Sequence, residues 1–157
     1  MVHVVITSFH HTSFTVSNLD EAEGFFVHNF GLERMGGGLF DFDNLREMVG
    51  LPGAILKIAY LAFPEKNGLR PPHRLELIEY VKPAGKSTDT ATNRPGNAHL
   101  CFEVEDIHAE YKRLSERGVR FKSAPKQVIW GVNKGAWSVY CNGPDGVALE
   151  LTQPAKT

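Results

Sequence analysis

The sequence predicts an α+β fold in which the order strand, helix, strands occurs twice along a chain of 157 residues. Three observations support this prediction: two stretches that begin at His11 and His99 match each other, each runs into a helix pattern, and alternating strand patterns follow each helix. The length suits a single domain. We therefore expect one domain over residues 1–157, with modules at about 5–85 and about 95–153.

The internal repeat is visible in two aligned stretches. They read His11-Thr-Ser-Phe-Thr-Val-Ser-Asn-Leu and His99-Leu-Cys-Phe-Glu-Val-Glu-Asp-Ile. Histidine, phenylalanine, valine and the first apolar helix residue coincide at a constant offset of 88 positions. Chance similarity between two amphipathic helices is the alternative, but it does not account for the strand, the cap and the stop that also match.

Each histidine stretch continues into a helix with local start and stop signals. In the first half Asn18 is the expected N-cap, Glu21 stands three residues later, and Gly31 ends the helix. In the second half Asp106 is the expected cap and Gly118 the stop. The apolar residues at helical spacing are Leu19, Ala22, Phe26 and Phe30 in the first helix and Ile107, Tyr111 and Leu114 in the second.

Strand patterns follow both helices. We expect strands at 54–62 and 74–81 in the first half, and at 119–121, 136–141 and 147–152 in the second, with a turn at 142–146 between the last two. His11 and Glu76 are 65 positions apart, whereas His99 and Glu150 are 51 apart, so the first half carries about 14 extra residues. The segments 36–38 and 64–73 are expected to hold them as loops.

Composition excludes several classes of protein. Hydrophobic residues make up 42% and charged residues 22%, which is ordinary for a globular domain. The net charge of -1 gives no basic excess for nucleic acid, and no apolar run approaches the ~20 residues that span a bilayer. No signal-peptide pattern opens the chain, and Cys101 and Cys141 do not make a disulfide framework. A reduced, cytoplasmic setting is expected.

Four polar residues share the inward phase of their strands. Side chains alternate between the two faces of a strand, and the apolar faces would pack against the helices. The opposite faces would line a curved sheet, and they carry His11, Glu76, His99 and Glu150. Any one of them alone would more simply be an exposed carboxylate or a hydrogen-bonded histidine. All four, at matching places in a repeat, favour a site for Zn, Ni, Co, Mn or Fe.

Strand phase also separates the near neighbours of these residues. Glu79 lies in the opposite phase to Glu76, and His10 is out of phase with His11. His108 falls on a helix and is expected to be solvated. The remaining histidines, His3, His28 and His73, have no counterpart in the repeat.

The sequence resembles the vicinal oxygen chelate superfamily, which includes glyoxalase I, methylmalonyl-CoA epimerase, extradiol dioxygenases and the fosfomycin and bleomycin resistance proteins. The stretches that carry the resemblance are the two histidine stretches, Leu75-Glu-Leu-Ile-Glu-Tyr and Pro144-Asp-Gly-Val-Ala-Leu-Glu-Leu-Thr. The resemblance implies two βαβββ modules that form a cupped mixed sheet around one divalent metal. Its ligands would be His11, Glu76, His99 and Glu150.

A ligand at Glu76 favours particular members of the superfamily. Extradiol dioxygenases and fosfomycin-modifying enzymes resemble the chain less, because they usually use two histidines and one glutamate. Glyoxalase I and the epimerase use a fourth ligand there, but the extra catalytic glutamate of the epimerase has no clear counterpart near residues 51–53, where Glu47 is the nearest candidate. We find no residues to assign to glutathione. The resemblance also implies a homodimer, since the family commonly pairs chains across sheet edges.

The expected chemistry is proton removal next to a carbonyl of a small oxygenated substrate, as in a glyoxalase-like lyase or an epimerase-like isomerase. The metal would act as a Lewis acid that stabilises the enolate. Glu150, or alternatively Glu76, would take the proton if it loosens from the metal. A ring-cleaving dioxygenase and a small-molecule binding or resistance protein remain the alternatives.

Three further features stay open between functional and ordinary structural roles. Arg94 could bind an acidic group of the substrate or form a surface ion pair. Residues 130–137 could form a mobile lid or an ordinary hairpin connection. Cys101, on the same face as His99, is expected to be a small buried thiol.

Overall fold

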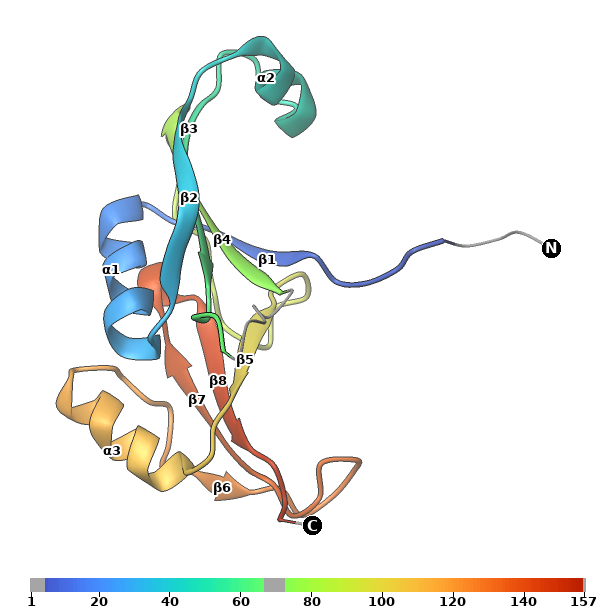
Figure 1. Cartoon of the computed structure of the whole chain (residues 1–157), viewed down its shortest axis with the longest axis vertical. Helices are drawn as coiled ribbons and strands as arrows, with labels where there is room; N and C mark the ends of the chain where they lie inside the picture. Colours follow the sequence, from blue (N-terminus) through green and yellow to red (C-terminus); the bar gives the residue numbers. More distant parts are fainter. Residues whose placement is uncertain (1–4, 67–72, 157) are drawn as a thin grey trace. The chain divides into compact units, whose positions relative to one another are not determined.

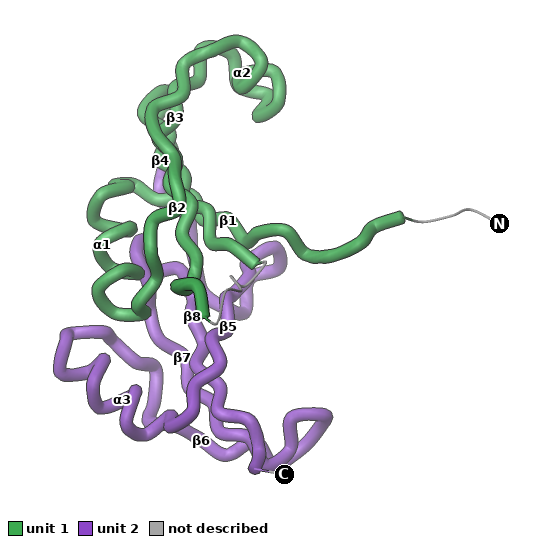
Figure 2. The backbone as a smooth tube through the Cα atoms, viewed as in Figure 1, with its two compact units in different colours: residues 1–85 green, residues 86–157 purple. Residues whose placement is uncertain are grey.

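The computed structural model describes residues 5–66 and 73–156. The chain divides into two compact units, residues 1–85 and 86–157 (Figure 2). Each unit contains a strand, a helix and three further strands in that order, with one additional helix in the first (Figure 1). The α+β class and the repeated βαβββ order are therefore confirmed. Instead of one continuous sheet, each unit has a four-stranded sheet of its own.

The first unit is a mixed sheet with two helices. Its elements are β1 (His11–Thr15), α1 (Leu19–Phe30), β2 (Glu33–Phe40), α2 (Asp43–Val49), β3 (Ile55–Ala62) and β4 (Arg74–Lys82). The strand order is β1-β4-β3-β2. β1 pairs with β4 in parallel, and the other pairs are antiparallel. Helix α1 connects β1 at one edge of the sheet to β2 at the other edge.

Helix α1 begins and ends where the sequence signals predict. The side chain of Asn18 accepts hydrogen bonds from the backbone N–H groups of Asp20 and Glu21, and Gly31 ends the helix with a φ of 69°. In the apolar stripe of α1, Leu19, Ala22 and Phe26 are buried and Phe30 is partly buried. The stripe packs on the sheet face that carries Leu75 and Leu77, which leaves the opposite face of β4 for Glu76.

The prediction that residues 36–38 form a loop is wrong, because these glycines lie inside β2. Gly37 has a φ of 129°, and a Cβ added there would lie 2.0 Å from the carbonyl oxygen of Ile58. Only glycine allows β2 to approach β3 this closely. Some of the extra residues of the first half form α2 instead of a loop. Of the other predicted loop, 64–73, only 64–66 and 73 lie within the described residues.

The second unit repeats the arrangement with one helix fewer. Its elements are β5 (His99–Glu103), α3 (Ile107–Glu116), β6 (Lys126–Gln127), β7 (Trp137–Asn142), the short 3₁₀ turn η1 (Pro144–Gly146) and β8 (Ala148–Gln153). The strand order is β5-β8-β7-β6, with β5 parallel to β8. The side chain of Asp106 caps α3 by accepting from the N–H groups of His108 and Ala109.

The expected strand at 119–121 is absent from the described structure. Phe121 makes a single antiparallel bridge to Cys141, flanked by hydrogen bonds from Lys122 N–H to the Tyr140 carbonyl and from Asn142 N–H to the Arg120 carbonyl. The fourth strand of the sheet is β6, further along the chain. The alternation of Val119 and Phe121 reflects anchoring of a connecting segment on β7, not a ladder of its own.

The register of the two parallel pairs is the same in both units. Ser13 of β1 lies opposite Glu76 of β4, and Cys101 of β5 lies opposite Glu150 of β8. In each case the histidine stands two positions earlier on the first strand and so shares its face. Among the described residues, no helix is long and apolar enough to cross a bilayer.

Candidate active site

In the first unit the sheet brings His11 and Glu76 together. The Nε2 atom of His11 lies 3.5 Å from Oε2 of Glu76. The Glu76 side chain is only 10% exposed, whereas that of His11 is 39% exposed. A carboxylate that is nearly buried requires compensating partners. The His11 ring supplies one such partner, and because the ring itself is partly exposed, a metal ion can also reach it.

A tyrosine from the neighbouring strand is the second partner of Glu76. Tyr60 of β3 stands directly opposite Glu76 in the ladder and hydrogen-bonds to its carboxylate. This hydrogen bond, and secondarily burial, raises the pKa of Tyr60 above its ordinary value of 10.0. The phenol therefore stays protonated at neutral pH and can act as a donor to the carboxylate.

The second unit holds the equivalent pair. Nε2 of His99 lies 3.1 Å from Oε2 of Glu150, and the two side chains are 44% and 16% exposed. Tyr140 of β7 stands opposite Glu150 in the ladder, and its hydroxyl lies 3.3 Å from Nε2 of His99. Burial, followed by the charge of Glu150 and a hydrogen bond to it, raises the pKa of Tyr140 to about 12.

Glu150 has one partner that Glu76 lacks. The hydroxyl of Ser138, also on β7, donates to Oε1 of Glu150. The other oxygen, Oε2, is the one that faces His99. Ser138 stands two residues before Tyr140, and the residue two positions before Tyr60 is Ile58, which has no hydroxyl.

The chemistry and spacing of each pair fit two ligands of one metal ion. Two donor atoms that each lie about 2.1 Å from a metal, at right angles to one another, are about 3.0 Å apart. The observed separations of 3.5 Å and 3.1 Å are close to this value. Within residues 5–66 and 73–156 there is no cluster of three or more histidine, cysteine, aspartate or glutamate side chains suited to a metal. Each unit by itself thus brings together two of the four residues predicted as ligands.

A cavity of about 840 Å³ in the second unit opens beside the His99–Glu150 pair. His99, Glu150 and Tyr140 line one part of it, and the connection between β6 and β7 lines another. The ammonium of Lys122 also lines the cavity and lies 5.9 Å from the centre of the Tyr140 ring. Such a cavity is large enough for a small organic substrate.

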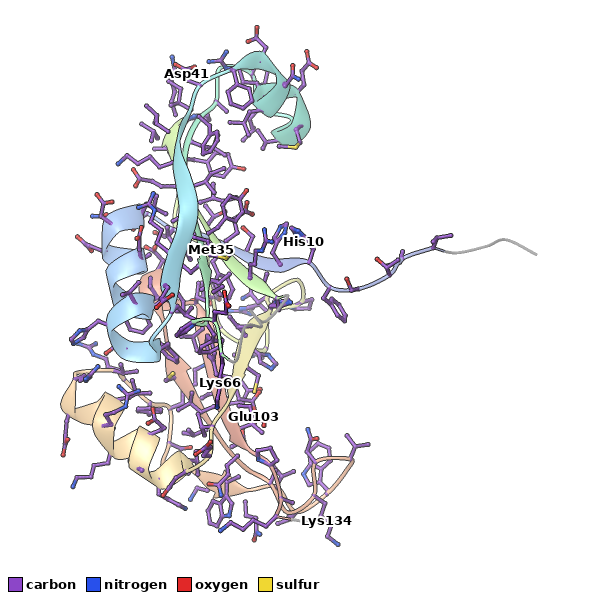
Figure 3. All side chains as sticks on the ribbon, in the orientation of Figure 1. His10, Met35, Asp41, Lys66, Glu103 and Lys134 are labelled. Atoms are coloured by element: carbon purple, nitrogen blue, oxygen red, sulfur yellow. The ribbon has the colours of Figure 1, made fainter. Side chains whose placement is uncertain are left out.

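The connection between β6 and β7 is an ordered hairpin extension. Backbone hydrogen bonds join Val128 N–H to the Ala136 carbonyl and Gly135 N–H to the Val128 carbonyl. These bonds support the ordinary-hairpin reading of residues 130–137. Trp130 at the cavity nevertheless remains 76% exposed. Lys134 marks this hairpin in Figure 3.

Glu79 and His10 do not join the His11–Glu76 pair in the way that Glu76 and His11 do. The carboxylate of Glu79 accepts a hydrogen bond of 2.8 Å from the N–H of Leu19, at the start of α1, and lies 3.4 Å from the ammonium of Lys57. It therefore faces the helix side of the sheet. His10, labelled in Figure 3, precedes β1, and its Nδ1 lies 2.8 Å from Nδ1 of His11.

Three other expectations are resolved by the structure. Arg94 pairs with Asp89 at 2.6 Å on the surface, as in its ordinary structural reading. His108 is exposed, but its ring lies 4.9 Å from that of Trp137. The expectation of a buried thiol at Cys101 is wrong, because its strand face is open, whereas Cys141 is buried, and both cysteines are free.

Sequence reasoning missed Tyr60, Tyr140 and Ser138. Strand phase alone would have placed all three on the inward faces, since Tyr140 alternates with the buried Val139 and Cys141. Their partnership with the glutamates depends on the cross-strand register, which the sequence does not specify.

Comparisons with known proteins agree on the family of this fold. A model of the Glyoxalase/Bleomycin resistance protein/Dioxygenase superfamily matches residues 8–151. A 2-epi-5-epi-valiolone epimerase from an Actinomyces species is 32% identical over 147 residues, which cover 90% of this chain and 76% of the relative.

Solved structures show the same fold. A glyoxalase family protein from Bacillus cereus superposes with a TM-score of 0.80 at 23% identity, over 99% of each chain. Glyoxalase I from Zea mays gives a TM-score of 0.62 at 18% identity and covers 96% of this chain and 46% of its own. With the matching family model and the repeated βαβββ units, these findings confirm the resemblance seen in the sequence: the chain belongs to the glyoxalase/bleomycin resistance/dioxygenase superfamily, the vicinal oxygen chelate proteins.

Proposed function

We propose that this chain is a metal-dependent isomerase of the epimerase type, which removes and returns a proton next to a carbonyl of a small oxygenated substrate. The observation that carries the proposal is that each unit has a His–Glu pair with a tyrosine opposite the glutamate in the ladder. The relative named an epimerase favours an isomerase over a glyoxalase-like lyase.

The proposed metal ligands are His11, Glu76, His99 and Glu150, with one divalent ion per chain. The nitrogen and oxygen donors suit Zn, Ni, Co, Mn or Fe. The spacing within each pair supports this choice. When bound, the ion would supply Lewis-acid stabilisation of negative charge that develops on the substrate oxygen.

The two glutamates are the proposed proton acceptors, with Glu150 preferred. Its Oε2 faces His99 beside the cavity, while the hydroxyl of Ser138 holds Oε1. A carboxylate held at one oxygen presents the other in a defined direction, so Oε2 would be positioned to take the proton when it is not bound to the ion. Glu76 is the alternative acceptor, and it is the more buried of the two side chains.

The substrate would occupy the cavity of the second unit. This cavity combines polar groups at the His99–Glu150 pair with apolar side chains of the β6–β7 connection, such as Ile129 and Trp130. Binding sites for small molecules commonly have this composition. An ammonium group, Lys122, is available there for an oxygen-rich ligand.

Solvent deuterium exchange tests the proposed reaction. Candidate carbonyl substrates should exchange the adjacent hydrogen with solvent deuterium in the presence of metal-loaded protein, and the exchange should persist without oxygen. Glu150→Gln should slow exchange by about 10²–10⁴-fold, the usual loss when a general base is removed. Metal content must be measured in the variant and kept near saturation, because the same residue is a proposed ligand.

The control and the opposing outcomes distinguish the three functions. Glu105→Gln changes an exposed glutamate on the segment between β5 and α3 and should leave exchange unchanged. Turnover that requires dissolved oxygen, with no exchange in its absence, would instead indicate a dioxygenase. Tight binding of a ligand with neither exchange nor turnover would indicate a binding protein.

A further inference from the structure

The four tyrosines of the chain divide into two pairs by what they contact. Tyr60 and Tyr140 each stand opposite a glutamate of the candidate site. Tyr80 packs against the apolar cluster that includes Leu56, as Tyr60 also does, but Tyr80 stands opposite Leu56 in the ladder. The ring of Tyr111 lies 4.7 Å from that of Phe121. Each unit therefore contains one tyrosine at its His–Glu pair and one elsewhere.

We propose that Tyr60 and Tyr140 are equivalent positioning residues, which hold Glu76 and Glu150 so that one carboxylate oxygen of each remains directed at the metal. This inference rests on the proposed metal site. It assigns a role to residues outside the ligand set and explains why a tyrosine occurs at the same ladder position in both units.

The contacts in the second unit show how the two carboxylate oxygens are divided. Oε2 of Glu150 lies 3.1 Å from Nε2 of His99, whereas Oε1 accepts from Ser138. The hydroxyl of Tyr140 hydrogen-bonds to Glu150 and lies 3.3 Å from Nε2 of His99. The tyrosine is thus within reach of both ligands of the pair and restricts the orientation of each.

The first unit has the His–Glu pair and the tyrosine opposite the glutamate, but not the serine. Tyr60 hydrogen-bonds to Glu76, whose Oε2 lies 3.5 Å from His11. At the place equivalent to Ser138 stands Ile58, which is 6% exposed and belongs to the apolar cluster. No side chain at that place can therefore replace the hydroxyl of Tyr60 if it is removed.

Hydrogen bonds of this kind have a measurable effect on metal binding. Groups that orient metal ligands typically contribute 10–100-fold to metal affinity. Tyrosine to phenylalanine keeps the ring and removes only the donor. Tyr60→Phe should therefore weaken metal binding by 10–100-fold. Tyr140→Phe should weaken it by less, because Ser138 still holds Oε1, and the Ser138→Ala/Tyr140→Phe double variant should reach the 10–100-fold range.

The experiment measures Co²⁺ binding to the purified full chain by competition with a chromophoric chelator, together with the visible absorption spectrum of the Co²⁺-loaded protein. Tyr80→Phe and Tyr111→Phe are matched controls, one in each unit, and should bind Co²⁺ within twofold of the unchanged protein. Thermal unfolding of the metal-free proteins shows whether a variant is folded. A change in affinity and spectrum without a change in unfolding temperature is the signature of positioning.

Each outcome bears on the proposal in a different way. Tyr60→Phe and the double variant binding as tightly as the controls, with an unchanged spectrum, would overturn it while leaving the proposed metal site intact. If Tyr60→Phe weakens metal binding but the Ser138→Ala/Tyr140→Phe double variant does not, the two tyrosines are not equivalent. If the unchanged protein binds no Co²⁺, Zn²⁺, Ni²⁺, Mn²⁺ or Fe²⁺, both the proposed function and this inference are wrong.

Discussion

Glu76 and Glu79 lie on the same strand, three residues apart, and face opposite sides of the sheet. Glu79 faces α1, where its carboxylate accepts from the N–H of Leu19 at 2.8 Å and lies 3.4 Å from the ammonium of Lys57. Glu76 faces the other side of the sheet and lies beside His11. Glu79→Gln should therefore reduce stability without affecting metal binding. Glu76→Gln should weaken metal binding without reducing stability.

The size of the stability effect follows from the environment of Glu79. Its side chain is 17% exposed, and it lies at the positive end of the dipole of α1. A negative charge there contributes 0.3–1 kcal/mol when exposed and up to about 2 kcal/mol when partly buried. Glutamine keeps an oxygen that can accept from Leu19 but loses the charge. We expect the free energy of unfolding to fall by about 1 kcal/mol, which corresponds to roughly 2–4 °C.

The assay compares the two variants in the same two measurements. Denaturant unfolding with a chelator present reports the stability of the metal-free chain, and competition with a chelator reports metal affinity. Glu76→Gln should weaken metal binding by more than about 100-fold, since even a residue that only orients a ligand contributes 10–100-fold. Equal losses of metal in both variants, or a loss only in Glu79→Gln, would refute the strand register on which the candidate site is based.

Three further predictions concern stability and assembly. Gly37→Ala should lower the free energy of unfolding by more than backbone strain alone, which is about 1–3 kcal/mol, since its Cβ would meet the Ile58 carbonyl. Gly36→Ala has open space around it and should change the free energy of unfolding little in the same denaturation experiment. Hydrogen bonds from the N–H groups of Ala109 and His108 lower the pKa of Asp106. The ionised carboxylate therefore stabilises the fold fully above its ordinary pKa of 3.8, and this stabilisation is lost as the pH falls through the lowered pKa. Asp106→Asn should remove this part of the acid dependence of unfolding. Light scattering at micromolar concentration should give twice the chain mass of 17.4 kDa, and a monomer mass would contradict the expected homodimer.

Local signals predicted the helices that pack behind the sheets. Asn18 and Asp106 cap α1 and α3 as expected, and Gly31 takes the left-handed conformation that ends α1. Such signals depend on a few neighbouring residues and do not require knowledge of the rest of the fold. Strand alternation predicted in the same way that Glu76 and Glu79 face opposite sides.

The elements that sequence reasoning missed have no such local signals. α2 has only seven residues, and Phe42 at its N-cap provides no side-chain hydrogen bond. β2 contains three consecutive glycines, which ordinarily indicate a loop. They lie in a strand here because β3 approaches β2 so closely at Gly37 that no larger residue fits there. β6 is two residues long. In each case tertiary packing, not the propensity of the segment, decides the structure.

The inner faces of the two units differ beside their His–Glu pairs. Ile58 pairs with Ile78 in the first unit, and Ser138 pairs with Thr152 at the same ladder position in the second. The two isoleucines pack with Leu45 of α2 in an apolar cluster, whereas Ser138 and Thr152 line the cavity. The inserted helix therefore covers the first inner face where the second remains open. Under the proposed function, the first unit then contributes ligands while the second contributes ligands and the walls of the substrate site. Substitutions at Ser138 should alter substrate binding, whereas Ile58→Val should act through stability, with the 0.5–1.5 kcal/mol loss usual for a buried isoleucine.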